Sequence, residues 1–209
     1  MKNFLFVLLV LLASGCAVGN KYNYQASSIA LPMKTESRDV LVLLVRDLRP
    51  YILNSEKTPD FVGLQRGGFG NPFDVTTVSG KPMATEMTAA IADGLVNSGY
   101  RVVDVYGEHD MNSLISRAAS EDASRIVVLR VREWKSDIMM SITVHCDMTL
   151  SIYQADGSLL AESSARFTQS AGGAQMGGNK NSQVVTKEFA KQIGYLFNEA
   201  SVREALARR

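Results

Sequence analysis

The chain has 209 residues, of which 46% are hydrophobic and 21% charged, with 22 basic residues against 21 acidic ones. The apolar content is too high for a disordered chain, and the length fits one domain of ordinary size. A net charge of +1 provides no strong field to attract a polyanion, so composition argues against a nucleic-acid partner.

The first sixteen residues have the features of an export signal. Lys2 precedes an unbroken apolar run at residues 4–12, which is too short to cross a hydrocarbon core that needs about 20 helical residues. ASGC at 13–16 resembles the bacterial lipobox, whose cysteine receives a diacylglyceryl thioether, although Ala stands where Leu is usual. We therefore expect residues 1–15 to be a lipoprotein signal peptide and Cys16 to be lipidated. The alternative is a plain secretory signal in which Cys16 is a chance thiol.

The lipobox resemblance also implies a location. Ala17 follows the cysteine, whereas in Gram-negative lipoproteins Asp at that place is associated with retention in the inner membrane. We expect an outer-membrane protein whose domain faces the periplasm, held by two or three acyl chains such as palmitate, because one chain binds only marginally. Cleavage before Cys16 leaves a neutral mature chain with 21 basic and 21 acidic residues. Residues 16–36 lack a sustained period and are expected to form a tether to one domain at 37–209.

The first half of that domain predicts a strand, a long loop, a helix and a second strand. VLVLLV at 40–45 is typical of a strand buried on both faces. Residues 51–80 contain several Gly and Pro and show no clear period, so we expect a long loop, with or without a short edge strand. An apolar stripe from Met83 to Leu95 predicts a helix that Gly99 ends, and residues 100–105 alternate as a strand.

The second half predicts a short helix, a strand, a long hairpin and a last helix. Every even-numbered residue from 138 to 152 is apolar and the intervening ones are mostly polar, which indicates one long strand with a buried face and a wet face. Met140 is among the residues expected in the core. Asp156-Gly157 is a favourable hairpin turn. The expected elements are a helix capped by Asp110 through about Ala119, strands at 126–131, 138–152 and 159–169, and a helix from about Ser182.

The predicted order is therefore β-α-β-α-β-β-β-α. It indicates an α/β (α+β) fold in which a mixed sheet carries helices packed mainly on one face and ends in a long antiparallel hairpin.

Few residues suit catalysis or metal binding. The mature chain offers His109, His145 and Cys146, but neighbours on a strand point to opposite faces, so His145 and Cys146 cannot hold one ion together. His145 and Asp147 share a face without a nucleophile partner. We predict no catalytic residue, no metal site and no cofactor.

The clearest candidate for binding is RGGFGNPF at 66–73. It is not a GxGxxG loop, because Phe73 stands where the third glycine should be. The segment is either a glycine-dependent turn or a partner-binding loop in which Arg66, Phe69 and Phe73 supply residue types enriched at interface hot spots. Trp134, expected at a strand end, is a further candidate contact, with a structural role as the alternative.

With these elements placed, the chain resembles the YajG-like family of bacterial lipoproteins. The resemblance rests on LLASGC at 11–16, GYRVV at 99–103, the segment 134–167 with its DG hairpin, and NKN at 179–181 before the last helix. RGGFGNPF has no counterpart in that pattern. The resemblance implies an envelope lipoprotein for which no catalytic residues are established.

We therefore predict a non-enzymatic, lipid-anchored envelope lipoprotein that binds another envelope component. One alternative is a periplasmic small-molecule binder or enzyme, with residues 51–80 as a lid over a pocket bordered by Arg46, Asp47, His145 and Asp147. Another is a structural subunit of a homo-oligomer.

Overall fold

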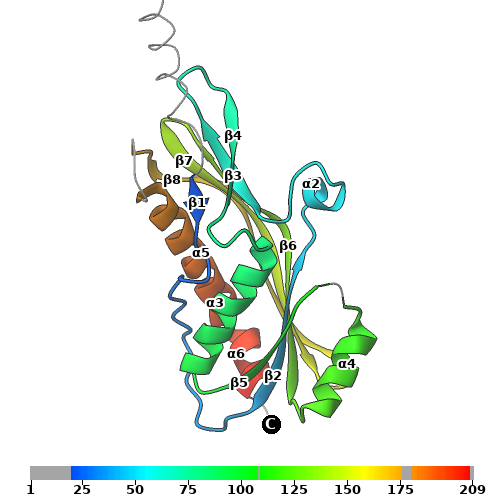
Figure 1. Cartoon of the computed structure of the whole chain (residues 1–209). Coiled ribbons are helices and arrows are strands. Elements are labelled where there is room, and N and C mark those ends of the chain that lie inside the picture. The colour runs from blue at the N-terminus through cyan, green and yellow to red at the C-terminus, as the bar shows by residue number, and fades with distance from the viewer. Residues whose placement is uncertain (1–19, 108, 176–179, 208–209) are drawn as a thin grey trace, which may run out of the picture.

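The computed structural model describes residues 20–107, 109–175 and 180–207 (Figure 1). The predicted signal peptide at 1–15, the lipidation site Cys16 and Ala17 lie outside these residues. No helix in the described ranges is both long and apolar enough to cross a membrane.

The described strands form one mixed sheet organised around β6, which has β7 and then β8 on one side in antiparallel register. On the other side, β2 pairs with the first half of β6 and β3 with its last residues, both in parallel. The sheet therefore divides into two arms, one continuing from β2 to β5 and the other from β3 to β4 and β1. The strands are β1 (Lys21–Tyr22), β2 (Val40–Asp47), β3 (Phe61–Arg66), β4 (Pro72–Thr77), β5 (Arg101–Val105), β6 (Arg125–Ile138), β7 (Ser141–Gln154) and β8 (Leu159–Gly173).

Helices cover one face of this sheet almost completely and the other only at one end. The larger core lies under α3, α5 and α6, and a smaller one lies under α4 (Figure 1). The helices are α2 (Pro50–Leu53), α3 (Met83–Asn97), α4 (Met111–Ser120), α5 (Lys180–Asn198) and α6 (Ala200–Ala207). The predicted α/β class, the mixed sheet and the packing of helices mainly on one face are confirmed.

The unbroken apolar run of β2 follows from this arrangement. Leu41 and Leu43 point into the larger core, whereas Val42 and Leu44 point into the smaller one under α4. Because both faces of β2 are covered, the strand has no polar side to show in its sequence.

The prediction of a single strand over 138–152 is wrong at its beginning. Ile138 ends β6, and Met139 and Met140 form a tight turn before β7, so β6 is longer than the expected 126–131. Met140 is 84% exposed and does not pack in the core. Ile138 pairs with Ile142 across the turn, so both lie on the same face and the even-odd alternation stays in phase. Met-Met carries no Gly or Asn to mark the turn, so the pattern did not reveal it.

Residues 51–80 are also more ordered than the expected loop. They contain α2 and the antiparallel pair β3 and β4. A Cβ on Gly63 would lie 2.3 Å from the Ser136 Oγ, so glycine is needed here for β3 to approach β6. In the sequence Gly63 favours a loop, whereas in the structure it allows β3 to pair with β6.

The predicted tether at 16–36 is likewise contradicted from residue 20 onward. Tyr22 and Tyr24 are fully buried, and Ile29 is nearly so. β1 pairs with β4, and the Tyr24 backbone N–H donates to the Glu86 carboxylate on α3 at 2.8 Å. Tyr22 and Tyr24 are buried by contacts with residues far away in the sequence, and a local sequence period does not reveal such contacts.

Candidate functional site

The candidate residues of the glycine-rich segment lie together on the β3–β4 hairpin. Phe69 is at its tip and 99% exposed, and Phe73 is 37% exposed. The Arg66 guanidinium donates to both carboxylate oxygens of Asp137 on β6, at 2.7 and 2.6 Å. This ion pair lowers the pKa of Asp137 below its ordinary value. Arg66 therefore fixes the hairpin to β6, and the two phenylalanines are the exposed part of the segment.

Trp134 occupies a different environment from the one expected of a contact residue. It lies within β6 and is fully buried. Its indole N–H donates to the Tyr24 hydroxyl at 2.9 Å. Its ring packs edge-on against Phe189 of α5, with 5.7 Å between the ring centroids. The prediction that Trp134 contacts a partner is wrong, and its role is structural.

A buried ion pair that sequence reasoning missed holds the two arms of the sheet at their branch point. The fully buried Arg49 donates to both carboxylate oxygens of Asp47, at 2.8 and 2.7 Å. Its remaining terminal nitrogen donates to the backbone carbonyls of Phe61 and Trp134, at 2.7 and 3.2 Å. Burial alone would lower the pKa of Arg49, but the Asp47 carboxylate raises it above its ordinary value. The signal in the sequence for this ion pair was an aspartate and an arginine two positions apart, directly after an apolar strand.

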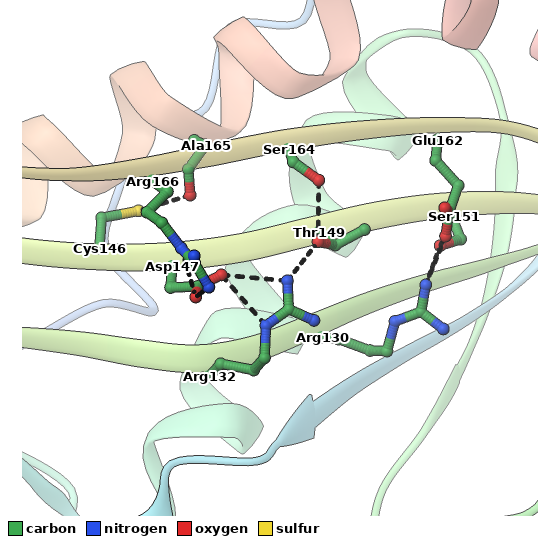
Figure 2. A network of polar contacts seen from close by, with 10 residues as sticks. All are labelled: Arg130, Arg132, Cys146, Asp147, Thr149, Ser151, Glu162, Ser164, Ala165 and Arg166. Atoms are coloured by element: carbon green, nitrogen blue, oxygen red, sulfur yellow. Dashed lines mark hydrogen bonds and ion pairs between the residues drawn. The ribbon is translucent and has the colours of Figure 1, made fainter.

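The most organised polar surface is the face of β6, β7 and β8 that points away from α5 and α6, which we call the wet face. Figure 2 shows Asp147 of β7 lying between two guanidinium groups, Arg132 of β6 and Arg166 of β8. Arg132 Nη2 lies 3.0 Å from Asp147 Oδ1, and Arg166 Nε donates to Oδ2 at 2.8 Å. Although desolvation would raise the pKa of Asp147, these hydrogen bonds hold it below its ordinary value.

The same network continues along the sheet through hydroxyl groups. Arg132 donates to Thr149 Oγ1 at 2.7 Å, and Thr149 hydrogen-bonds Ser164 at 2.9 Å (Figure 2). Nearby, Arg130 donates to Ser151 at 2.6 Å and is paired with Glu162.

The strand register places Arg46 of β2 directly beside Arg130 of β6, on this same face. The centre of the wet face therefore carries more positive than negative charge. Its basic residues are Arg46, Arg130, Arg132, Lys135 and Arg166, and its acidic residues are Glu133, Asp147 and Glu162.

His145 and Cys146 lie on opposite faces of β7, as predicted. His145 Nδ1 is 3.1 Å from Thr168 Oγ1 on the wet face, whereas the Cys146 thiol is buried and its pKa is raised to about 12 by desolvation. His109 is distant from both, with Nε2 3.0 Å from the Tyr106 carbonyl oxygen. Within residues 20–107, 109–175 and 180–207, no cluster of three or more His, Cys, Asp or Glu could hold a metal ion.

The expected pocket bordered by four polar residues does not form. Arg46 and Asp47 line a hollow of about 210 Å³ between the end of β2, α2 and the start of α3, but His145 and Asp147 lie apart from it on the wet face. Residues 61–66 and 72–77 are strands of the sheet, so the predicted lid at 51–80 is contradicted. A wider groove of about 690 Å³ lies between β5 and α4, where Asp104, His109 and Arg117 are among its lining residues.

No family model matches the chain, and no curated protein matches its sequence. The resemblance to the YajG-like family therefore remains a resemblance. Among solved structures, protein XCC0632 from Xanthomonas campestris, of the family DUF330, has a similar fold over 87% of this chain and 95% of its own, with a TM-score of 0.53 and 11% identity.

More distant similarities include a lipoprotein and a dodecameric protein. Lipoprotein GNA1162 from Neisseria meningitidis aligns over 75% of this chain and 98% of its own, with a TM-score of 0.43 and 12% identity. The PelC dodecamer from Paraburkholderia phytofirmans aligns over 80% of this chain and 92% of its own, with a TM-score of 0.43 and 17% identity. At such identities the comparisons inform the fold and leave the activity to be argued from the residues.

Proposed function

We propose that the protein is a lipid-anchored outer-membrane lipoprotein whose domain faces the periplasm and binds another envelope protein without catalysing a reaction. The N-terminal ASGC motif, with Ala17 after the cysteine, supports the anchor and its location. The wet face supports the binding role, and the observation that carries it is the pair of arginines that share the single carboxylate of Asp147.

The charge balance of this face suits an acidic partner. Asp147 can neutralise only one of the two guanidinium groups that it joins, and basic residues outnumber acidic ones on this face. The predicted mature chain is neutral as a whole, so the excess is local. Arginine is enriched at protein interfaces because its planar group offers several donors to carboxylates in a fixed geometry.

The wet face is also rigid, which favours binding. Its side chains stand on three long neighbouring strands and are held by hydrogen bonds to Thr149, Ser151 and Ser164. Groups that are already ordered lose little conformational entropy when a partner binds. The hollow beside Arg46, at about 210 Å³, is smaller than the roughly 300–1,000 Å³ of common ligand pockets, whereas the groove between β5 and α4, at about 690 Å³, falls within that range.

The anchor is tested by replacing Cys16 with alanine in cells. We expect the wild-type protein in the outer-membrane fraction, with acyl chains on its N-terminal peptide in the mass spectrum, and the Cys16→Ala variant without them. A wild-type protein whose N-terminal peptide carries no lipid would overturn the anchor.

The binding surface is tested by photo-crosslinking in living cells from position 168 on the wet face. We expect one defined adduct that is strongly reduced by Arg132→Glu with Arg166→Glu, because charge reversal repels an acidic partner. Position 191, exposed on α5, is the control crosslinking site, and Arg117→Glu on α4 is the matched charge reversal. An adduct of twice the protein's own mass would support the homo-oligomer instead, and no adduct specific to position 168 would contradict the proposed surface.

A further inference from the structure

One end of the sheet presents exposed apolar side chains from two hairpins. Gln65 of β3 pairs with Ile138 of β6, so the β3–β4 hairpin and the β6–β7 turn end side by side. Figure 1 shows this end on the opposite side of the molecule from α4 and α6. It carries Phe69 (99% exposed), Phe73 (37%), Met139 (49%) and Met140 (84%), which together we call the apolar rim.

The described chain begins at this same end. The Asn20 side chain donates to the Gln65 Oε1 at 2.9 Å. β1 runs parallel to β4, and β4 leads away from the hairpin tip, so the amino end of β1 faces the tip. The candidate lipidation site Cys16 is four residues before Asn20 in the sequence.

We propose that the apolar rim inserts into the headgroup region of the membrane leaflet that holds the lipid on Cys16. This inference rests on the proposed lipidation. Four peptide steps span at most about 14 Å, which limits the separation between Cys16 and Asn20. The register of β1 with β4 places Asn20 level with Val75, and from there the β3–β4 hairpin extends four to five residues, roughly 14–17 Å, to its tip. Because the two lengths are similar, the rim lies at the membrane surface whenever the lipid is inserted.

The composition of this end matches a bilayer better than a protein partner. The rim consists of two aromatic and two thioether side chains, which are favourable at the boundary between headgroups and acyl chains. Lys21 on β1, the strand paired with β4, is exposed and suits anionic phospholipid headgroups. The short connection to the lipid also leaves little space for a folded partner between the rim and the membrane.

The test uses the full lipidated mature protein on vesicles of phosphatidylethanolamine and phosphatidylglycerol. An environment-sensitive fluorophore is attached through Phe69→Cys or, as control, through Leu159→Cys, which is 54% exposed at the opposite turn of the long hairpin. Labelling is selective because the lipid would occupy Cys16, and Cys146 is buried with its pKa raised to about 12. We expect the probe at 69 to shift its emission to the blue, to be quenched by lipids with nitroxide-labelled acyl chains, and to resist aqueous iodide. The probe at 159 should stay accessible to iodide.

A vesicle-bound, lipidated protein whose probe at 69 remains accessible to iodide would overturn the inference while leaving the anchor intact. Protection from iodide without quenching by the labelled lipids would also overturn it, because the rim would then contact protein. An unlipidated wild-type protein, seen in the mass spectrum, would overturn both the anchor and the inference.

A second measurement follows transfer of the lipidated protein between vesicles. Phe69→Ser with Met140→Ser should accelerate transfer by about tenfold or more, because each apolar side chain removed from the membrane weakens attachment. Leu159→Ser is the matched control and should leave the rate unchanged. Both rim residues are exposed, so the variants keep the fold. Equal transfer rates for the three proteins would contradict insertion of the rim.

Discussion

The two faces of the β6–β7–β8 sheet are built from the same strands, but one packs in the core and the other carries ion pairs. Cys146 and Asp147 are neighbours on β7, yet the thiol is buried against the backbone of β8 while the carboxylate joins two arginines on the opposite face. The buried face holds Trp134 and Met148 beneath α5 and α6, and the wet face holds the charged network. We therefore expect stability to depend mainly on the buried face and recognition on the wet face. Four measurements test this expectation.

The largest effect should come from Trp134→Ala. The side chain is fully buried between Tyr24 and Phe189, so its removal leaves a large cavity. We expect a loss of about 3–5 kcal/mol in the free energy of unfolding, measured by urea denaturation. A loss below about 1 kcal/mol would show that this face does not dominate stability.

A smaller loss should follow Tyr24→Phe. This change removes the acceptor of the Trp134 indole N–H and leaves a buried donor without its partner, at a cost of about 1–3 kcal/mol. It also tests whether residues 20–33 belong to the domain and not to a tether. Tyr195→Phe, on an exposed tyrosine, is the control and should unfold at the same urea concentration as the wild type.

On the wet face, Asp147→Asn should cost less than about 1 kcal/mol at neutral pH, because ion pairs with exposed arginines contribute little. The folded pKa of Asp147 is lowered, so its stabilisation is complete above the ordinary carboxyl pKa of about 3.9 and is lost as the pH falls through the lowered value. The difference in unfolding free energy between wild type and variant should therefore shrink in acid. A difference that is constant from neutral pH to acid would contradict the ion pairing.

The smallest effect should be seen at Cys146, where the folded protein should hardly react with iodoacetamide near pH 8. Burial raises its pKa to about 12, so almost no thiolate is present, and the thiol is also inaccessible. In urea the reaction should proceed at the rate of an ordinary cysteine. Fast alkylation of the native protein would contradict the assignment of Cys146 to the buried face of β7.

Sequence reasoning succeeded where one physical period dominates. The alternation in β7 assigned His145 and Asp147 to one face and Cys146 to the other, and the apolar run of β2 indicated a strand covered on both sides. It failed where the period carries no information, as at the Met139-Met140 turn. It also failed where contact partners are remote, since no local pattern announces that Tyr24 accepts a hydrogen bond from Trp134.

Local periodicity and one short motif were enough to predict the α/β class, the faces of the long strands and a lipid anchor. Three arrangements became visible only in the folded chain: Arg49 lies buried at the branch of the sheet, two arginines share Asp147, and Phe69 and Met140 lie at the end where the described chain begins. These arrangements depend on strand register between residues far apart in the chain. Register is set by the simultaneous packing of all strands and helices, which no single segment encodes.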